Sequence, residues 1–183
     1  MKWFIASDIH GSAYYCDKMI EAYVKSGADR MLLLGDLLYH GPRNDLPRDY
    51  DPKRVIAALN ALSGEIFAVR GNCEAEVDQM VLDFPVLADY CVIHDAGMMI
   101  FATHGHVYNT GNPPKIKGGA ILLHGHTHVP AYEDHGDYIY INPGSVSIPK
   151  NGSPHSYMTL CDGVFTRYDL QGGEYERLSP DPV

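Results

Sequence analysis

The N-terminal segment reads MKWFIASDIHGSAYYCDKMIEAYVKSGADRMLLLGD, residues 1–36 of the chain. Two short apolar runs, at 2–7 and 30–34, have the length and composition of buried strands. Between them, residues 13–26 have a helical pattern, with Ser12 at a position typical of an N-cap and Gly27 at a position typical of a C-terminal cap. A strand, a helix and a second strand in this order predict a parallel βαβ unit.

The same organisation continues to about residue 71 and then changes. A loop rich in Gly, Pro and Asp occupies residues 37–50, Pro52 opens a predicted helix that runs to about residue 62, and 65–69 is a third strand. Beyond residue 85, short strand-like runs are separated by hairpin signals at 95–97, 135–137 and 162–163. This order predicts an α/β protein whose two sheets face each other with helices outside. We expect the whole chain, 1–183, to form one domain.

Composition argues against several classes of protein. The chain has 14 Lys and Arg against 23 Asp and Glu, a net charge of −9, which disfavours nonspecific binding to nucleic acids. No segment is apolar for long enough to span a bilayer, and Asp8 comes too early for a signal-peptide core, so we expect a cytoplasmic protein that does not bind membranes. The four cysteines are widely spaced without a CxxC pair, which indicates neither a disulfide framework nor a zinc ribbon.

Side chains able to bind metal ions follow the ends of the predicted strands. They are Asp8, His10, Asp36, Asn72, His104, His126 and His128. Open α/β sheets bind ligands at the carboxyl ends of their strands. Asp8 and His10 are two residues apart, as are His126 and His128, so in extended backbone the members of each pair would point the same way and share a ligand. Each motif alone is also typical of a turn, and their recurrence at strand ends is what favours a common site.

The donor types indicate the chemistry of that site. Imidazole, carboxylate and amide oxygens suit Mn, Fe, Zn or Ni better than they suit an all-oxygen Mg or Ca site. A carboxylate at Asp36 could bridge two ions about 3.5–4 Å apart. Two such ions would convert a bridging water to hydroxide and neutralise charge on phosphoryl oxygens, so no side-chain nucleophile is required. The donor set therefore predicts a phosphoesterase that uses two divalent metal ions.

Five motifs occur in order along the chain: Asp8-x-His10, Gly35-Asp36, Gly71-Asn72-Cys73-Glu74, Thr103-His104-Gly105-His106 and Gly125-His126-Thr127-His128. This ordered set resembles the calcineurin-like metallophosphoesterases over almost the whole chain. The small size and the segments at 41–44 and 142–147 are most similar to the small bacterial phosphodiesterases of that family. The resemblance implies a four-layer α/β/β/α sandwich of two mixed β-sheets flanked by helices.

The resemblance also implies a ligand set for each of two metal ions, with manganese as the usual ion of the family. One ion would be held by Asp8, His10, Asp36 and His128. The other would be held by Asp36, Asn72, His104 and His126, so that Asp36 is the bridge. The implied activity is hydrolysis of a small phosphodiester by a hydroxide that bridges the two metals.

Three further residues are candidates for direct roles in catalysis. Arg43, on the loop after Asp36, could bind a phosphate oxygen through its guanidinium or simply be solvated. His106 could act as an acid or base beside the metals or be a turn residue. Cys73 stands where members of the wider superfamily commonly have a histidine that protonates the leaving group. A thiol is a weak hydrogen-bond donor, so we expect Cys73 to be a poor general acid.

Several functional alternatives remain open in the sequence. A phosphomonoesterase or a nucleotide pyrophosphatase would use the same metals and differ only in its pocket. A metal-binding scaffold for protein interactions is another alternative, because a retromer subunit resembles this fold and works through its protein surfaces. The complete set of ligand residues argues against a pure scaffold. A homo-oligomer is compatible with the sequence.

Overall fold

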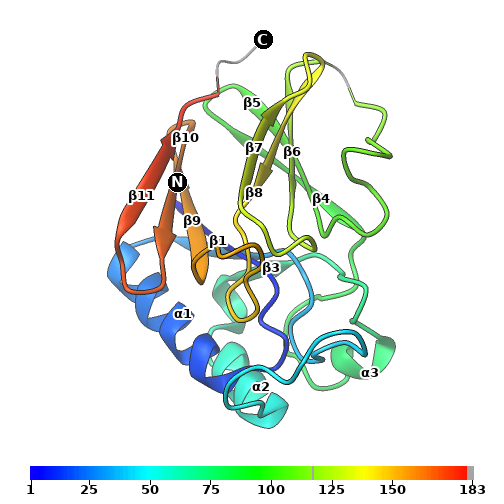
Figure 1. The fold of residues 1–183 in the computed structure, drawn as a ribbon, viewed down its shortest axis with the longest axis vertical. Helices are drawn as coiled ribbons and strands as arrows, with labels where there is room; N and C mark the ends of the chain where they lie inside the picture. Colours follow the sequence, from blue (N-terminus) through cyan, green and yellow to red (C-terminus); the bar gives the residue numbers. More distant parts are fainter. Residues whose placement is uncertain (117, 181–183) are drawn as a thin grey trace.

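A computed structural model of the chain describes residues 1–116 and 118–180. Within these residues the strands form two sheets (Figure 1). The strands of the first sheet are β1 (Trp3–Ala6), β2 (Arg30–Leu33), β3 (Ile66–Ala68), β9 (Ser156–Cys161), β10 (Val164–Asp169) and β11 (Glu174–Leu178). Those of the second are β4 (Tyr90–Asp95), β5 (Met98–Thr103), β6 (Ala120–His124), β7 (Ala131–Asp134) and β8 (Tyr138–Asn142).

Both sheets are mixed. The first has the order β11-β10-β9-β1-β2-β3, in which β1, β2 and β3 are parallel and β9 runs antiparallel to β1. The second has the order β4-β5-β6-β8-β7, with β5, β6 and β8 parallel and an antiparallel strand at each edge. The predicted α/β class and the two mixed sheets are therefore confirmed.

The helices begin and end where the local sequence favours it. Helix α1 (Ala13–Ser26) is capped by the Ser12 hydroxyl, which accepts a hydrogen bond from the Tyr15 amide, and it ends at Gly27 in a left-handed conformation. Helix α2 (Pro52–Asn60) stops two residues before the predicted end. A 3₁₀ turn at Ser63–Glu65 and the short α3 (Glu76–Gln79) were not predicted.

Two apolar cores give the molecule its layers. In β1, Phe4 and Ala6 pack toward α1 and α2, whereas Ile5 packs into the space between the two sheets. Strands covered on both faces read as continuous apolar runs, which is why residues 2–7 and 30–34 show no alternation. Figure 1 shows α1 and α2 lying together beside the first sheet.

The outer face of the second sheet is covered differently. Phe101 lies on the face opposite its neighbours Ile100 and Ala102, which point into the core between the sheets. The rings of Tyr90 and Tyr108 pack on Phe101, at centroid distances of 4.7 and 5.6 Å. The two longest helices, α1 and α2, thus lie against the first sheet and not against the second. Among the residues described, none of the helices has the length and apolar character needed to cross a membrane.

Candidate metal centre

The loops after β1 and β2 are joined by backbone hydrogen bonds that extend the parallel pairing beyond the strands. The amides of Asp8, His10 and Gly11 donate to the carbonyls of Gly35, Asp36 and Leu37 at 3.1, 2.9 and 2.8 Å. The loop after β6 is attached to the same place, because the His126 amide donates to Asp8 Oδ2 at 3.0 Å. Residues from distant parts of the chain therefore meet at one end of the sheets.

Five of the predicted ligands have left-handed backbone conformations. Their φ angles lie between 51° and 67°, at Asp8, His10, Asp36, His126 and His128. Such conformations cost about 1–3 kcal/mol each in residues other than glycine and cluster at functional sites. The expectation of extended backbone at the two paired motifs was therefore wrong. Asp8 and His10 still converge on one point, but His126 and His128 lie in different groups of side chains.

The first group of side chains contains Asp8, His10 and His128, all buried. Asp8 Oδ1 lies 3.6 Å from His10 Nε2 and 3.3 Å from His128 Nε2. The two Nε2 atoms are 3.2 Å apart. Three potential ligand atoms thus face a common point.

The second group contains Asp36, His104 and His126. His104 Nε2 lies 3.5 Å from Asp36 Oδ2 and 3.1 Å from His126 Nδ1. Asn72 joins this group, because its Oδ1 is 3.1 Å from the same His104 nitrogen.

Asp36 lies between the two groups. Its Oδ2 atom is 3.7 Å from His10 Nε2 in the first group and 3.5 Å from His104 Nε2 in the second. Its other oxygen, Oδ1, accepts a hydrogen bond of 2.9 Å from the Cys73 amide, which holds the carboxylate in this orientation. One carboxylate oxygen thus lies within 3.7 Å of a ring nitrogen in each group.

The hydrogen bonds of three histidines test whether this arrangement suits metal ions. The Nδ1 atoms of His10, His104 and His128 donate to the carbonyls of Tyr39, Leu34 and Ile148 at 2.8, 2.6 and 2.7 Å. A neutral imidazole whose Nδ1 carries the hydrogen presents a lone pair at Nε2, which is the usual arrangement in metal-binding histidines. The Nε2 lone pairs of His10 and His128 thus face each other, and that of His104 faces Asp36.

A buried carboxylate oxygen points to the same conclusion. Asp8 Oδ1 is buried and has no hydrogen-bond partner among the described residues. An unpaired carboxylate oxygen facing imidazole lone pairs is unfavourable unless a cation lies between them. The side chains therefore fit divalent metal ions.

The pKa shifts show strong coupling within the centre. Burial favours the neutral form of Asp8, but His10 and His128 outweigh it and hold the pKa of this carboxyl well below its usual value. Burial likewise opposes the charged form of His104, whereas Asp36 and Asp8 raise the pKa of this imidazole to about 9. Burial and the neighbouring His104 lower the pKa of His126 to about 4. In the absence of metal, Asp36 and Asp8 thus favour the protonated form of His104.

Glu74 supports the centre in a way that was missed from the sequence. Its carboxylate is buried and accepts hydrogen bonds from the amides of Asp36, Leu37 and Gly71, at 2.8, 2.7 and 2.5 Å. Burial and the nearby Asp36 charge raise the pKa of Glu74 to about 7. One side chain thus connects the loops after β2 and β3. Its place in the motif Gly71-Asn72-Cys73-Glu74 was the signal that the sequence offered.

The segment at 142–147 supports the loops that carry the ligands. Asn142 Nδ2 donates to the Gly125 carbonyl and to Thr127 Oγ1, at 2.9 and 3.0 Å. The hydroxyls of Ser145 and Ser147 each donate to the Asp8 carbonyl at 3.0 Å. These buried hydrogen bonds help to hold the backbone on either side of the first group of ligands.

A pocket of about 480 Å³ opens above the centre. Two of the three additional candidates, Arg43 and Cys73, line it. His106 lies beside the ligands, with its ring centroid 5.4 Å from that of His104, but it is not among the residues that line the pocket. Lys150 does line the pocket, and the sequence had not indicated it.

Comparison with known proteins identifies the family. Residues 1–161 match the calcineurin-like phosphoesterase superfamily domain. The chain belongs to this family.

The most informative relative is phosphodiesterase YfcE of Escherichia coli strain K12. The two sequences are 45% identical over 166 residues, which cover 91% of this chain and 90% of YfcE. A solved structure of YfcE, described as a phosphoesterase from E. coli, superposes with a TM-score of 0.94 at 41% identity, over 99% of this chain and 100% of that one. Vps29 from Chaetomium thermophilum has a TM-score of 0.63 at 16% identity, covering 100% of this chain and 96% of Vps29, and shares the fold alone.

Proposed function

We propose that this protein is a phosphodiesterase that uses two divalent metal ions. The observation that carries the proposal is the pair of ligand groups with Asp36 between them. The similarity to YfcE, a phosphodiesterase, supports the choice of substrate class. Asp8, His10 and His128 would hold one ion, Asn72, His104 and His126 the other, and Asp36 both.

The protein would hold the ions, keep their histidine ligands in the right tautomer and bind the substrate. The ions, when bound, would lower the pKa of a water molecule and neutralise charge that develops on the phosphoryl oxygens. The carbonyls of Tyr39, Leu34 and Ile148 fix the tautomers of three histidines, so that their Nε2 atoms stay available as ligands. Arg43 would hold a phosphoryl oxygen with its guanidinium, because it lines the same pocket as Asp36.

Manganese is our proposed ion. It is the ion expected from the resemblance to the family, and the carboxylates and the amide oxygen, which accompany four imidazoles, are donors that suit it. Iron, zinc and nickel would fit the same donors, so the choice has to be made by reconstitution.

A metal-reconstituted activity screen tests this function. Metal-free protein would be loaded separately with Mn, Fe, Zn, Ni or Mg and assayed against an aryl phosphodiester, an aryl phosphomonoester and nucleotides. We expect the diester to be hydrolysed with the highest kcat/KM, and the Asp8→Asn variant, prepared in parallel, to be inactive. A higher kcat/KM for the monoester or the nucleotides would replace the proposed substrate class. Absence of any metal-dependent hydrolysis would favour the protein-interaction scaffold.

A further inference from the structure

The pocket above the metal centre is larger than a phosphoryl group, and most of the residues that line it are polar. Its volume of about 480 Å³ falls in the range of pockets that bind whole small molecules. The lining residues are Asp36, Gly41, Pro42, Arg43, Asn44, Asn72, Cys73, His126, Thr127, His128 and Lys150. Apart from the imidazoles of His126 and His128 none of these has an aromatic ring, and Pro42 is the largest apolar side chain among them. This lining favours a hydrophilic group in the part of a substrate that lies beyond the phosphoryl group.

Lys150 is held in a defined position relative to the centre. Its amide donates to the His128 carbonyl at 3.1 Å. The amide and the hydroxyl of Ser153 both donate back to the Lys150 carbonyl, at 3.0 and 2.7 Å. Asn151 and Gly152 between them have φ angles of 55° and 71°, as in a tight type I′ turn. The backbone is therefore fixed while the side chain of Lys150 is exposed to the pocket.

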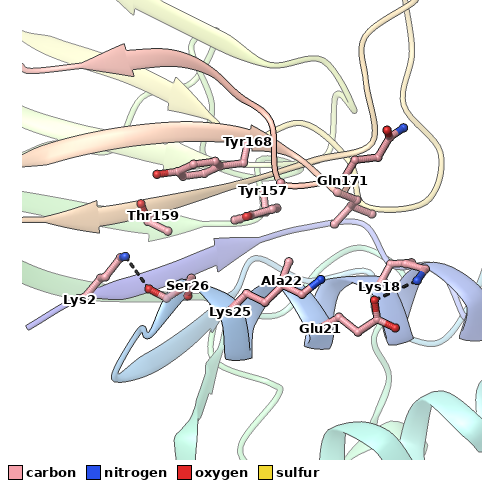
Figure 2. A pocket seen from close by; sticks show the side chains of 12 residues that line it. Lys2, Lys18, Glu21, Ala22, Lys25, Ser26, Tyr157, Thr159, Tyr168 and Gln171 are labelled. Atoms are coloured by element: carbon pink, nitrogen blue, oxygen red, sulfur yellow. Dashed lines mark hydrogen bonds and ion pairs between the residues drawn. The ribbon is translucent and has the colours of Figure 1, made fainter.

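The Lys150 ammonium is not used within the protein. Among the described residues, neither Lys150 nor Arg43 has a side-chain hydrogen bond or an ion pair to a protein acceptor. A second hollow, between α1 and the β9–β10 region, shows the contrast (Figure 2). There, Lys2 Nζ donates to the Ser26 carbonyl at 2.6 Å and Lys18 pairs with Glu21 at 2.9 Å. Lys25 of that hollow has no such partner among the described residues either, so Arg43 and Lys150 are distinguished by lying in the same pocket as the metal-binding side chains.

The overall charge of the chain makes these two cations significant. The net charge of −9 disfavours the approach of anions to the chain as a whole, so an anionic substrate depends on local positive charge. Arg43, with its forked guanidinium, suits the phosphoryl group itself. A lysine acts as a flexible point charge and suits a separate anionic group that lies farther from the metals.

We infer that Lys150 is a specificity-determining residue that binds a second anionic group on a hydrophilic phosphodiester. This inference rests on the proposed phosphodiesterase function, and it assigns that activity a substrate class: diesters that carry a further carboxylate or phosphate. Lys150 acts on the part of the substrate that does not react.

Two binding probes of almost the same size test the inference. Glycerol 3-phosphate and 3-phosphoglycerate each have one phosphate, and only the latter has a carboxylate. Their Kd values for the metal-loaded protein would be measured by titration calorimetry for wild type, Lys150→Gln and Lys150→Arg. The control is Lys53→Gln, because Lys53 is an exposed lysine of α2 that does not line the pocket. We expect wild type to prefer 3-phosphoglycerate about fivefold, the factor given by an exposed ion pair of about 1 kcal/mol.

The variants separate a specificity role from other roles of Lys150. The preference should disappear in Lys150→Gln and remain in Lys150→Arg and Lys53→Gln, with little change in the Kd of glycerol 3-phosphate. Equal weakening of both probes by Lys150→Gln would place Lys150 on the shared phosphate and overturn the inference. A wild-type protein without the preference would also overturn it.

A kinetic arm distinguishes failure of the inference from failure of the proposed function. Two aryl diesters with the same leaving group, one with a neutral and one with an anionic retained group, would be compared in the same variants. Lys150→Gln should raise KM about fivefold for the anionic diester alone. If wild type hydrolyses neither diester but retains the binding preference, the phosphodiesterase proposal fails and the anion-binding role of Lys150 stands. If both are hydrolysed and Lys150→Gln affects them equally, only the inference on Lys150 fails.

Discussion

The structure predicts that this enzyme lacks an efficient general acid for the leaving group. Burial and the Asp36 carboxylate raise the pKa of the Cys73 thiol, so the thiol keeps its proton. That proton is directed at Asp36 Oδ2, 3.4 Å away, rather than at the open pocket. Burial and the neighbouring His104 lower the pKa of His106, which favours its neutral form, and a neutral imidazole is a poor proton donor.

The expected change in kcat/KM follows from how much a general acid usually contributes to the rate. Protonation of the leaving group typically contributes about 10²–10⁴-fold to the rate, which corresponds to about 3–5 kcal/mol. An aryl oxide can leave without a proton, whereas an alkoxide leaves slowly without one. We therefore expect Cys73→Ser and His106→Ala to change kcat/KM for an aryl diester less than about threefold, because neither variant removes such a contribution. Cys73→His should accelerate an alkyl diester by up to about 10²-fold and an aryl diester much less.

The assay is kcat/KM for a series of diesters that share one retained group and differ in the pKa of the leaving alcohol. The slope of log kcat/KM against this pKa should be steep in wild type and shallower in Cys73→His. A large loss in Cys73→Ser that grows with leaving-group pKa would refute the reasoning and identify the thiol as the acid. The same pattern in His106→Ala would assign the role to that histidine.

The remaining predictions concern the metal ligands and their support. Asp36→Asn should weaken the binding of both metal ions, which calorimetric metal titration can measure. If one site keeps its affinity and catalysis is retained, Asp36 is not a bridging ligand. His128→Ala should empty only the site that Asp8 and His10 share with it. Anomalous scattering from a manganese-soaked crystal of the variant measures this, and loss of the ion beside Asn72 and His104 instead would reverse our assignment. Glu74→Ala leaves three buried amides without acceptors, each worth about 1–3 kcal/mol, so urea unfolding should show a loss of several kcal/mol; a loss within experimental error would contradict the supporting role. In the metal-free protein, the raised pKa of His104, about 9 against an ordinary value of 6.5, gives stability that is complete below pH 6.5 and is lost as pH rises through 9. The thermal midpoint of wild type should therefore approach that of His104→Asn over this range, and a constant difference between them would argue against the shift.

The local structure of the first 70 residues is predictable from the sequence. Ser12 and Gly27 determine where α1 begins and ends, because capping and a left-handed terminus depend on neighbouring backbone alone. The turns at Ala96-Gly97 and Asp162-Gly163 are likewise local, with positive φ angles at every position. The pairing of β1 with β9 is different, because it joins Ile5 to Met158. Nothing in either strand alone specifies that partner.

The sequence by itself determined which residue types follow the strands, and hence the kind of chemistry. Carboxylates, imidazoles and an amide at strand ends already indicate a metal centre, because ligand preference depends on the donor atoms. The tertiary structure decided how those donors are grouped. His126 and His128 diverge because their backbone is left-handed, and Glu74 and Lys150 reach the centre through contacts between segments distant in the chain. The spacing of two residues in the sequence predicts whether their side chains point the same way only where the backbone is a regular helix or strand. The loops of this site are instead shaped by hydrogen bonds that form only after the sheets have assembled.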